Sequence, residues 1–164
     1  MASCHQQQIG PQLGDHGWVG EAGAVHGATI DTMTSLHDSA DFIGPSALKH
    51  DLQDDVFRYC TFDGLDVEGQ GFEGIAVGCA FKNSSWYWSL FNTARLVEVE
   101  FTNCVFRGCG FAGCIFTRCR FVNCQFTKGN LGGDCTFDDC SWYDCEQANC
   151  EGLPASFTRS VERR

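Results

Sequence analysis

The chain has 164 residues and a formal net charge of −10, which suits one domain with an appended segment and disfavours direct binding to nucleic acid. No apolar run is long enough to span a bilayer, so no membrane span is expected. The first residues lack the basic start and apolar stretch of a secretory signal, and the sequence therefore predicts a cytoplasmic protein with reduced thiols.

The first fifty residues differ in composition from the rest. Residues 1–28 are rich in Gly, Gln and His and predict a disordered tail. In residues 29–51 apolar side chains recur at near-helical spacing, at Ile30, Met33, Leu36 and Ala40. This spacing predicts one short amphipathic helix, ended by Gly44 and Pro45, that caps the domain behind it.

From Leu52 onward the sequence repeats every five residues. The clearest run is a series of six phenylalanines, Phe101, Phe106, Phe111, Phe116, Phe121 and Phe126. A cysteine stands two residues before each of the last five, at Cys104, Cys109, Cys114, Cys119 and Cys124. The segment is therefore a repeat with one large and one small residue in each unit.

The repeat extends in both directions from this run. Upstream the large residues continue in register at Leu96, Phe91, Trp86 and Phe81. After a shortened step, a second register holds Val77, Phe72, Val67, Phe62, Phe57 and Leu52. Downstream the run continues at Leu131 and, after a step of six, at Phe137, Trp142 and Gln147.

A period of five fits neither a helix nor a flat strand. It fits a square coil in which each pentapeptide forms one side, the large and small residues point inward, and each coil climbs about 4.8 Å. The sequence therefore predicts an all-β quadrilateral β-helix of about five coils over residues 52–152. Residues 153–164 are expected to form a C-terminal tail.

This pattern resembles that of the pentapeptide-repeat proteins over about residues 52–150. The resemblance implies a right-handed quadrilateral β-helix. It says less about function, because the family includes quinolone-resistance proteins that bind DNA gyrase as DNA mimics, translocated bacterial effectors and members without an assigned role.

The cysteines predict packing and not metal binding or catalysis. Zinc sites use pairs such as CxxC, whereas the spacing here is CxxxxC, at the position where the repeats place a small residue. The solenoid segment has no His to activate a nucleophile, and there is no phosphate-binding glycine loop. We therefore expect no enzyme activity and no cofactor, and we expect the five cysteines above to be buried, reduced and metal-free.

Folding the repeat into four faces makes residues about twenty apart vertical neighbours. Glu98 then lies below Arg118, and Glu100 lies below Arg120. Above Glu68, another face carries an aromatic and cationic patch, Tyr87, Trp88, Arg107 and Lys128. Exposed Trp, Tyr and Arg are typical of interface hot spots, so this patch is the predicted partner-binding site. The alternative is that Tyr87 and Trp88 pack under the N-terminal segment.

A further face is rich in glycine and is expected to be nearly smooth, with Gly71, Gly74, Gly110, Gly113, Gly132 and Gly133. A homodimer could form through either of two surfaces, this glycine-rich face or an exposed end of the solenoid.

The function predicted is non-catalytic protein binding, of the type that neutralises or protects a target protein. One alternative is a DNA-mimic modulator of DNA gyrase. A duplex mimic needs continuous negative charge, but the segment between Phe101 and Leu131 has no acidic residue and carries Arg107, Arg118, Arg120 and Lys128. The other alternative is a secreted bacterial effector. The identity of the partner is left open.

Overall fold

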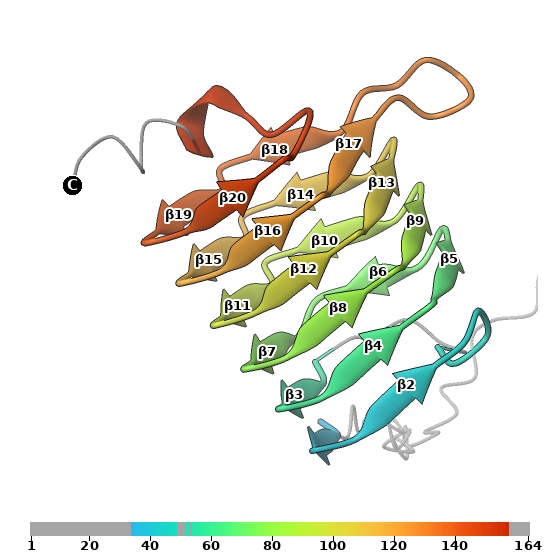
Figure 1. Ribbon diagram of the computed structural model, residues 1–164, viewed down its shortest axis with the longest axis vertical. Helices are drawn as coiled ribbons and strands as arrows, with labels where there is room; N and C mark the ends of the chain where they lie inside the picture. Colours follow the sequence, from blue (N-terminus) through green and yellow to red (C-terminus); the bar gives the residue numbers. More distant parts are fainter. Residues whose placement is uncertain (1–33, 49–51, 53, 158–164) are drawn as a thin grey trace, which may run out of the picture. The chain divides into compact units, whose positions relative to one another are not determined.

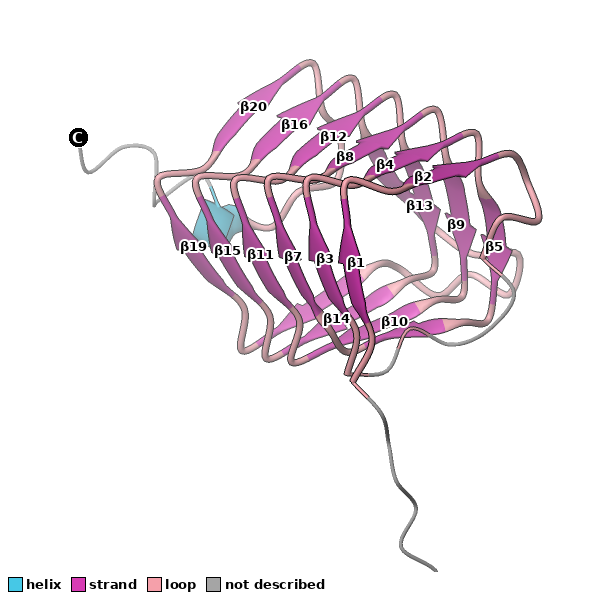
Figure 2. Cartoon of the chain, turned by 90° about the horizontal axis from the view of Figure 1, so that it is seen from below, coloured by secondary structure: helices cyan, strands magenta, loops and turns pink. Residues whose placement is uncertain are grey.

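The computed structural model describes residues 34–48, 52 and 54–157, all within one compact unit, Thr32–Arg164. In this part of the chain, twenty short parallel strands follow one another around a square tube (Figures 1 and 2). The segment expected to be a disordered tail, 1–28, lies outside the described residues.

Four parallel sheets form the walls of the tube, and the chain visits them in turn. The first wall consists of β1 (Leu36–Asp38), β3 (Val56–Arg58), β7 (Ile75–Val77), β11 (Arg95–Val97), β15 (Ile115–Thr117) and β19 (Ser141–Tyr143). The second consists of β2 (Asp41–Ile43), β4 (Thr61–Asp63), β8 (Ala80–Lys82), β12 (Glu100–Thr102), β16 (Arg120–Val122) and β20 (Glu146–Ala148). The third consists of β5 (Asp66–Glu68), β9 (Ser85–Tyr87), β13 (Val105–Arg107) and β17 (Gln125–Thr127). The fourth consists of β6 (Gly71–Phe72), β10 (Leu90–Asn92), β14 (Gly110–Ala112) and β18 (Thr136–Asp138).

The predicted quadrilateral β-helix is confirmed. Strands β3 to β18 make four complete coils, and β1–β2 and β19–β20 add half a coil at either end. The described residues contain no helix long and apolar enough to cross a membrane.

The central residue of each strand before β20 points into the tube, and the aromatic ones stack on their neighbours one coil away. Along the second wall, the ring centroids of Phe62 and Phe81 are 4.3 Å apart, those of Phe81 and Phe101 5.0 Å, and those of Phe101 and Phe121 4.9 Å. All six phenylalanines of the clearest run are buried. Because buried aromatic side chains remove the most apolar area from water, these columns supply most of the stabilisation of the fold.

The corners of the tube need a residue in the left-handed conformation, and asparagine tolerates this conformation better than most side chains. Asn83, Asn103 and Asn123 occupy one corner with φ of 48°, 54° and 53°. Their side chains form a ladder, in which Nδ2 of Asn103 donates to Oδ1 of Asn83 at 3.0 Å and Nδ2 of Asn123 donates to Oδ1 of Asn103 at 3.1 Å. The corner is thus held by side-chain as well as backbone hydrogen bonds.

The prediction of a helix within residues 29–51 is wrong for the residues that the structure describes. Residues 36–43 form β1 and β2, and Leu36 is exposed where the helix would have buried it. His37 and Phe42 are two further central residues, stacked on Phe57 at 4.7 Å and on Phe62 at 4.8 Å. The solenoid therefore begins earlier than predicted, with the two strands β1 and β2 before the predicted start at Leu52, because a His ring can take the central position at the half-exposed end of the tube.

The step of four residues in the repeat was predicted between Val77 and Phe81, but it lies one repeat earlier. The central residue of β7 is Ala76, which is fully buried, and not Val77, which lies on the outer side of the strand. The step of four residues runs from Phe72 to Ala76, where Gly74 is buried at the corner. A side chain at position 74 would collide with the carbonyl oxygen of Asp55, so the short corner requires glycine.

Leu131 was predicted to be a central residue, but its side chain is 82% exposed. The next strand after Phe126 is β18, whose central residue is Phe137. The residues between β17 and β18 therefore form an inserted loop, visible in Figure 1. Inside this loop the N–H of Gly129 donates to the carbonyl of Gly133 at 2.8 Å. Gln147, another predicted central residue, is exposed in the last half coil.

The C-terminal end of the core is covered by Phe157, in a helical turn that includes Ala155–Phe157. Its buried ring meets Trp142 edge-on at 5.1 Å and Phe121 at 6.0 Å. The expected C-terminal tail thus contributes the buried Phe157 and the partly buried Leu153 to the core, and residues 158–164 lie outside the described residues.

Candidate binding surface on the third wall

The third wall brings the residues of the predicted patch into one outer column. Glu68, Tyr87, Arg107 and Thr127 are successive partners in the parallel ladder of β5, β9, β13 and β17. Tyr87 is half-buried, whereas Arg107 is exposed. The guanidinium carbon of Arg107 lies 5.7 Å from the centroid of the Tyr87 ring, within the range of a cation–π contact.

Trp88 is the corner residue next to this column, and its placement is unusual. Its backbone has φ of 51°, which is rare for a large aromatic residue, and its side chain is 47% exposed. The indole rests on two glycines of the chain above it, because a Cβ at Gly108 would lie 3.0 Å from the indole and one at Gly129 would lie 2.5 Å from Nε1. These contacts hold the ring in place while half of it faces solvent.

The ring of Tyr87 extends the Trp88 surface, with centroids 5.5 Å apart. The described contacts of Trp88 are therefore with its own solenoid, through Gly108 and Gly129. The alternative in which the N-terminal segment covers both rings concerns residues outside the described part of the chain.

Lys128 lies at the edge of this surface, at the start of the inserted loop. Its Nζ is 3.4 Å from Oδ1 of Asp134, and both side chains are about two-thirds exposed, at 68% and 67%. An exposed pair of this kind contributes little to stability. Lys128 therefore remains available to an incoming partner.

The predicted charge pairs on the other walls differ from each other. Arg118 donates from Nε and Nη2 to Oε1 of Glu98, at 2.9 and 2.7 Å, as predicted. Glu100 and Arg120 are neighbours in the ladder, but Oε1 of Glu100 accepts a hydrogen bond from the hydroxyl of Thr102 at 2.9 Å.

The glycine-rich face is less smooth than predicted. Gly71 and Gly110 flank Leu90 in the ladder of the fourth wall, and Leu90 is 48% exposed between them. A Cβ at Gly110 would lie 3.1 Å from Cδ1 of Leu90. Gly132 and Gly133 belong to the inserted loop and have open space around them.

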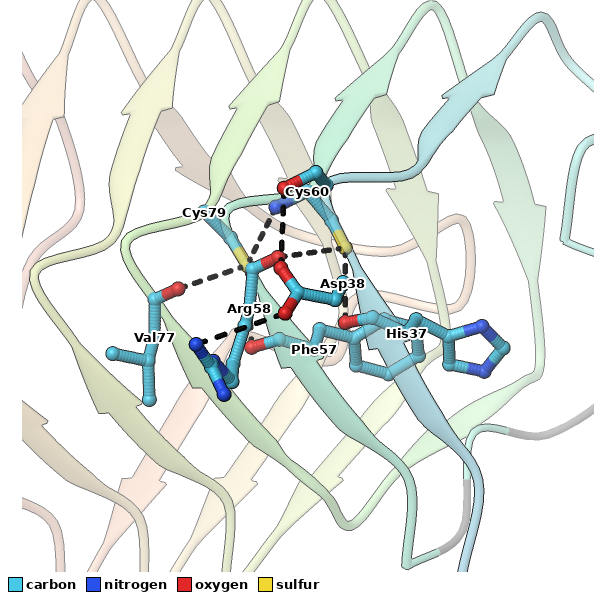
Figure 3. A network of polar contacts seen from close by, with 8 residues as sticks. His37, Asp38, Phe57, Arg58, Cys60, Val77 and Cys79 are labelled. Atoms are coloured by element: carbon cyan, nitrogen blue, oxygen red, sulfur yellow. Dashed lines mark hydrogen bonds and ion pairs between the residues drawn. The ribbon is translucent and has the colours of Figure 1, made fainter.

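The cysteines lie at the inner corners as small hydrogen-bonding residues. Figure 3 shows the pattern for Cys60 and Cys79, whose thiols donate to backbone carbonyls, Cys60 to Arg58 at 3.3 Å and Cys79 to Val77 at 3.5 Å. All five cysteines of the clearest run are buried, and the eleven cysteines of the described residues are free thiols. Among these residues, no group of three or more metal-binding side chains is placed to hold an ion.

His37 is the only histidine of the solenoid among the described residues. It was predicted to lie outside the repeat. Its ring stacks on Phe57 at 4.7 Å and meets Phe42 edge-on at 5.6 Å. Its Nε2 lies 3.9 Å from Oδ2 of Asp55. These contacts make His37 a core ring with one polar edge, and they do not place it beside a nucleophile.

Two consecutive coils carry cysteine at every corner, so thiols stack in vertical pairs. The Cys109 thiol donates to the carbonyl of Trp86 at 3.3 Å in the neutral state. Its ability to donate to the Cys135 thiolate instead lowers the pKa of Cys135 to about 7. The pKa of Cys109 is raised, first by the same interaction with Cys135 and then by burial. Cys150 is also half-buried, but burial raises its pKa.

Native-state alkylation should therefore distinguish these thiols. We expect Cys135 to react with iodoacetamide faster than Cys150 at pH 7 and its rate to rise as the pH passes about 7, because the thiolate is the nucleophile. Cys104 and Cys109 should stay unmodified until the protein unfolds. Mass spectrometry of the labelled peptides measures each site, and rapid labelling of Cys109 in the folded protein would contradict the packing described above.

The fold defines a class of protein, the parallel quadrilateral β-helix built from five-residue units. A family model for pentapeptide repeats matches residues 94–133 with eight copies. Residues 94–133 therefore match pentapeptide repeats, and the resemblance seen in the sequence is confirmed over this segment.

One of two similar solved structures supports the same fold, and the second has a lower TM-score. Rfr23, a pentapeptide repeat protein from the cyanobacterium Cyanothece 51142, is 8% identical, with 71% of this chain and 84% of that chain covered and a TM-score of 0.52. Full-length QnrB1, a plasmid-mediated fluoroquinolone resistance protein, is 11% identical over 79% of this chain and 99% of its own, with a TM-score of 0.20. No curated protein matches the sequence.

Proposed function

We propose that this protein is a non-catalytic binding solenoid that docks a target protein on the surface formed by Tyr87, Trp88 and Arg107, with Lys128 at its edge. The observation that carries the proposal is Trp88, whose indole is 47% exposed and held over Gly108 and Gly129. Large exposed aromatic side chains mark interaction sites, and Trp, Tyr and Arg are the side chains enriched in interface hot spots.

Rigidity supports the same proposal. The backbone of Trp88 is tied to the next coil by its N–H, which donates to the carbonyl of Arg107 at 3.0 Å. Tyr87 is covered on one side by the guanidinium of Arg107. Because these side chains are already ordered, a partner would lose little conformational freedom in binding them.

The chemistry of the surface indicates the kind of partner. The indole and phenol offer an apolar platform, while Arg107 and Lys128 add positive charge at its edge. A target with an apolar pocket or side chain bordered by acidic residues would complement both parts. Neutralisation or protection of such a target is the role that we assign, and DNA gyrase is one target to be tested.

Replacement of Trp88 by alanine should weaken binding of the target by about 2 kcal/mol or more, roughly thirtyfold, because the central contact is lost. Tyr59 provides a matched control, since it too is an exposed corner aromatic with φ of 53°, lies against a glycine of the next coil, Gly78, and has an arginine, Arg58, over its ring. Tyr59→Ala should leave the affinity unchanged.

The target can be captured from cells on the wild-type protein, and its affinity for each variant can then be measured by isothermal titration. Circular dichroism melts of the three proteins show whether the folded fraction is the same. Equal affinities of wild type and Trp88→Ala per folded molecule would refute this docking surface. Inhibition or protection of gyrase in a supercoiling assay by wild type, lost with Trp88→Ala, would identify gyrase as the target.

A further inference from the structure

The outer surface of the first wall differs from that of the other three walls. The residue before the central side chain is apolar in four of its six strands, at Leu36, Val56, Ile75 and Ile115. The residue after it is apolar in three, at Val77, Val97 and Tyr143. On the second wall the corresponding positions include Asp41, Glu100, Arg120 and Glu146.

This apolar wall faces solvent in the described part of the chain. Leu36 is 61% exposed, Ile75 40% and Tyr143 57%. Figure 2 shows β1, β3, β7, β11, β15 and β19 side by side along one wall, with no other described strand over them. An exposed apolar surface of this kind marks an interaction site.

Charged side chains interrupt the apolar surface at two places, because Asp38 and Arg58 form an ion pair at 3.6 Å on β1 and β3, and Arg95 lies at its middle. Arg95, on β11, is exposed and has no ion pair within the described residues. One coil below, a shallow hollow at the rim of the same wall is lined by Asp54, Glu73 and Ile75, and Arg95 reaches its upper edge. An unpaired cation and a pair of acids therefore lie on either side of the centre of the wall, which falls between β7 and β11.

We propose that the first wall binds the first wall of a second copy of this chain, with the two tubes antiparallel. A two-fold axis along the strands, midway between β7 and β11, places each β7 opposite the other copy's β11. Arg95 of each copy then meets the rim hollow of the other, beside Glu73. Val77 faces the second copy's Val97, and Val56 faces the second copy's Ile115.

This self-complementary arrangement is what selects a second copy over another protein. The same operation that brings apolar residues together also pairs Arg95 with Glu73 twice, once on each side of the axis. A parallel arrangement of the tubes would place Arg95 opposite Val97 and leave the guanidinium buried without a partner.

The size of the wall indicates a weak dimer. Six strands about 4.8 Å apart and three residues long cover roughly 24 Å by 10 Å, which is about a third of the ~800 Å² that each partner contributes to a standard interface. We therefore expect a concentration-dependent equilibrium between monomer and dimer. The inference is independent of the proposed function, because the Trp88 surface lies on another wall.

Sedimentation equilibrium of the full chain from about 5 µM to about 500 µM tests the dimer. Val97→Lys should raise the dissociation constant at least about tenfold, because a charge would be buried at the centre of the interface. Val122→Lys is the matched control, since Val122 has the same position and partial exposure on the second wall. It should leave the dissociation constant unchanged.

Charge reversal tests the arrangement itself. Arg95→Glu should weaken the dimer about tenfold, and Arg95→Glu combined with Glu73→Arg should restore it, because both reciprocal pairs are re-formed. A wild-type protein that stays monomeric throughout the range would overturn the proposal. So would equal weakening by Val122→Lys, or a double variant no tighter than Arg95→Glu alone.

Discussion

Replacement of Phe111 by alanine should lower the free energy of unfolding by about 3–5 kcal/mol, the usual loss for a buried phenylalanine. The ring is 3% exposed and is stacked between Phe91 at 4.7 Å and Phe137 at 4.8 Å. Phe106 and Phe126 meet its column edge-on. Because these neighbours are fixed by their own coils, they cannot close the cavity that the substitution leaves.

Phe42→Ala is the matched control, because it removes the same ring from the first half coil. Phe42 stacks on Phe62 at 4.8 Å, but it is only partly buried. Phe42→Ala should lower the free energy of unfolding by about half as much as Phe111→Ala, since fewer contacts and less apolar area disappear. Urea denaturation of both variants measures the difference. Equal losses would mean that the end coil is packed as tightly as the middle of the tube.

The regular middle of the solenoid could be predicted because every coil applies the same constraint. The central residue Phe106 lies between Trp86 and Phe126, one coil below and one above, and its large apolar ring fills the space between them. A corner such as Cys104 has space for a small side chain that can donate to a carbonyl. These two requirements recur every five residues and are therefore visible in the sequence.

The ends of the solenoid could not be predicted in the same way, because the constraint is weaker there. At position 37 a histidine replaces the large apolar residue, since its ring has a coil on one side only and a polar edge can face Asp55. At position 147 a glutamine is tolerated for the same reason. The spacing of Leu36 and Ala40 is compatible with a helix, but both are explained by the five-residue repeat.

The candidate surfaces were predicted in part. The outward direction of Trp88 follows from its place two residues after Trp86, but its support by Gly108 and Gly129 depends on the inserted loop. The apolar first wall was missed, because its residues are separated by 19 to 26 positions once the short step and the loop are counted. The signal that could have found it is an apolar residue directly before the central residue in every fourth repeat.

Gly74→Ala should lower the free energy of unfolding by about 3 kcal/mol, although it adds one methyl group at a position whose φ is not left-handed. The added Cβ would collide with the carbonyl oxygen of Asp55, which accepts the ladder hydrogen bond from the N–H of Ile75 at 2.9 Å. Relief of the collision requires the backbone of one coil to move away from the next. That movement weakens the hydrogen bond at the short corner, where the wall has no spare residue to absorb it.

Gly133→Ala separates this steric effect from a general effect of replacing glycine. Gly133 is exposed, and a Cβ there has no neighbouring atom within 4 Å. The free energy of unfolding should stay within about 0.5 kcal/mol of the wild type, as for most surface substitutions. Denaturation midpoints of the two variants give the comparison. If Gly74→Ala were as stable as Gly133→Ala, the short corner would have to lie elsewhere, and the register between Phe72 and Ala76 would be wrong.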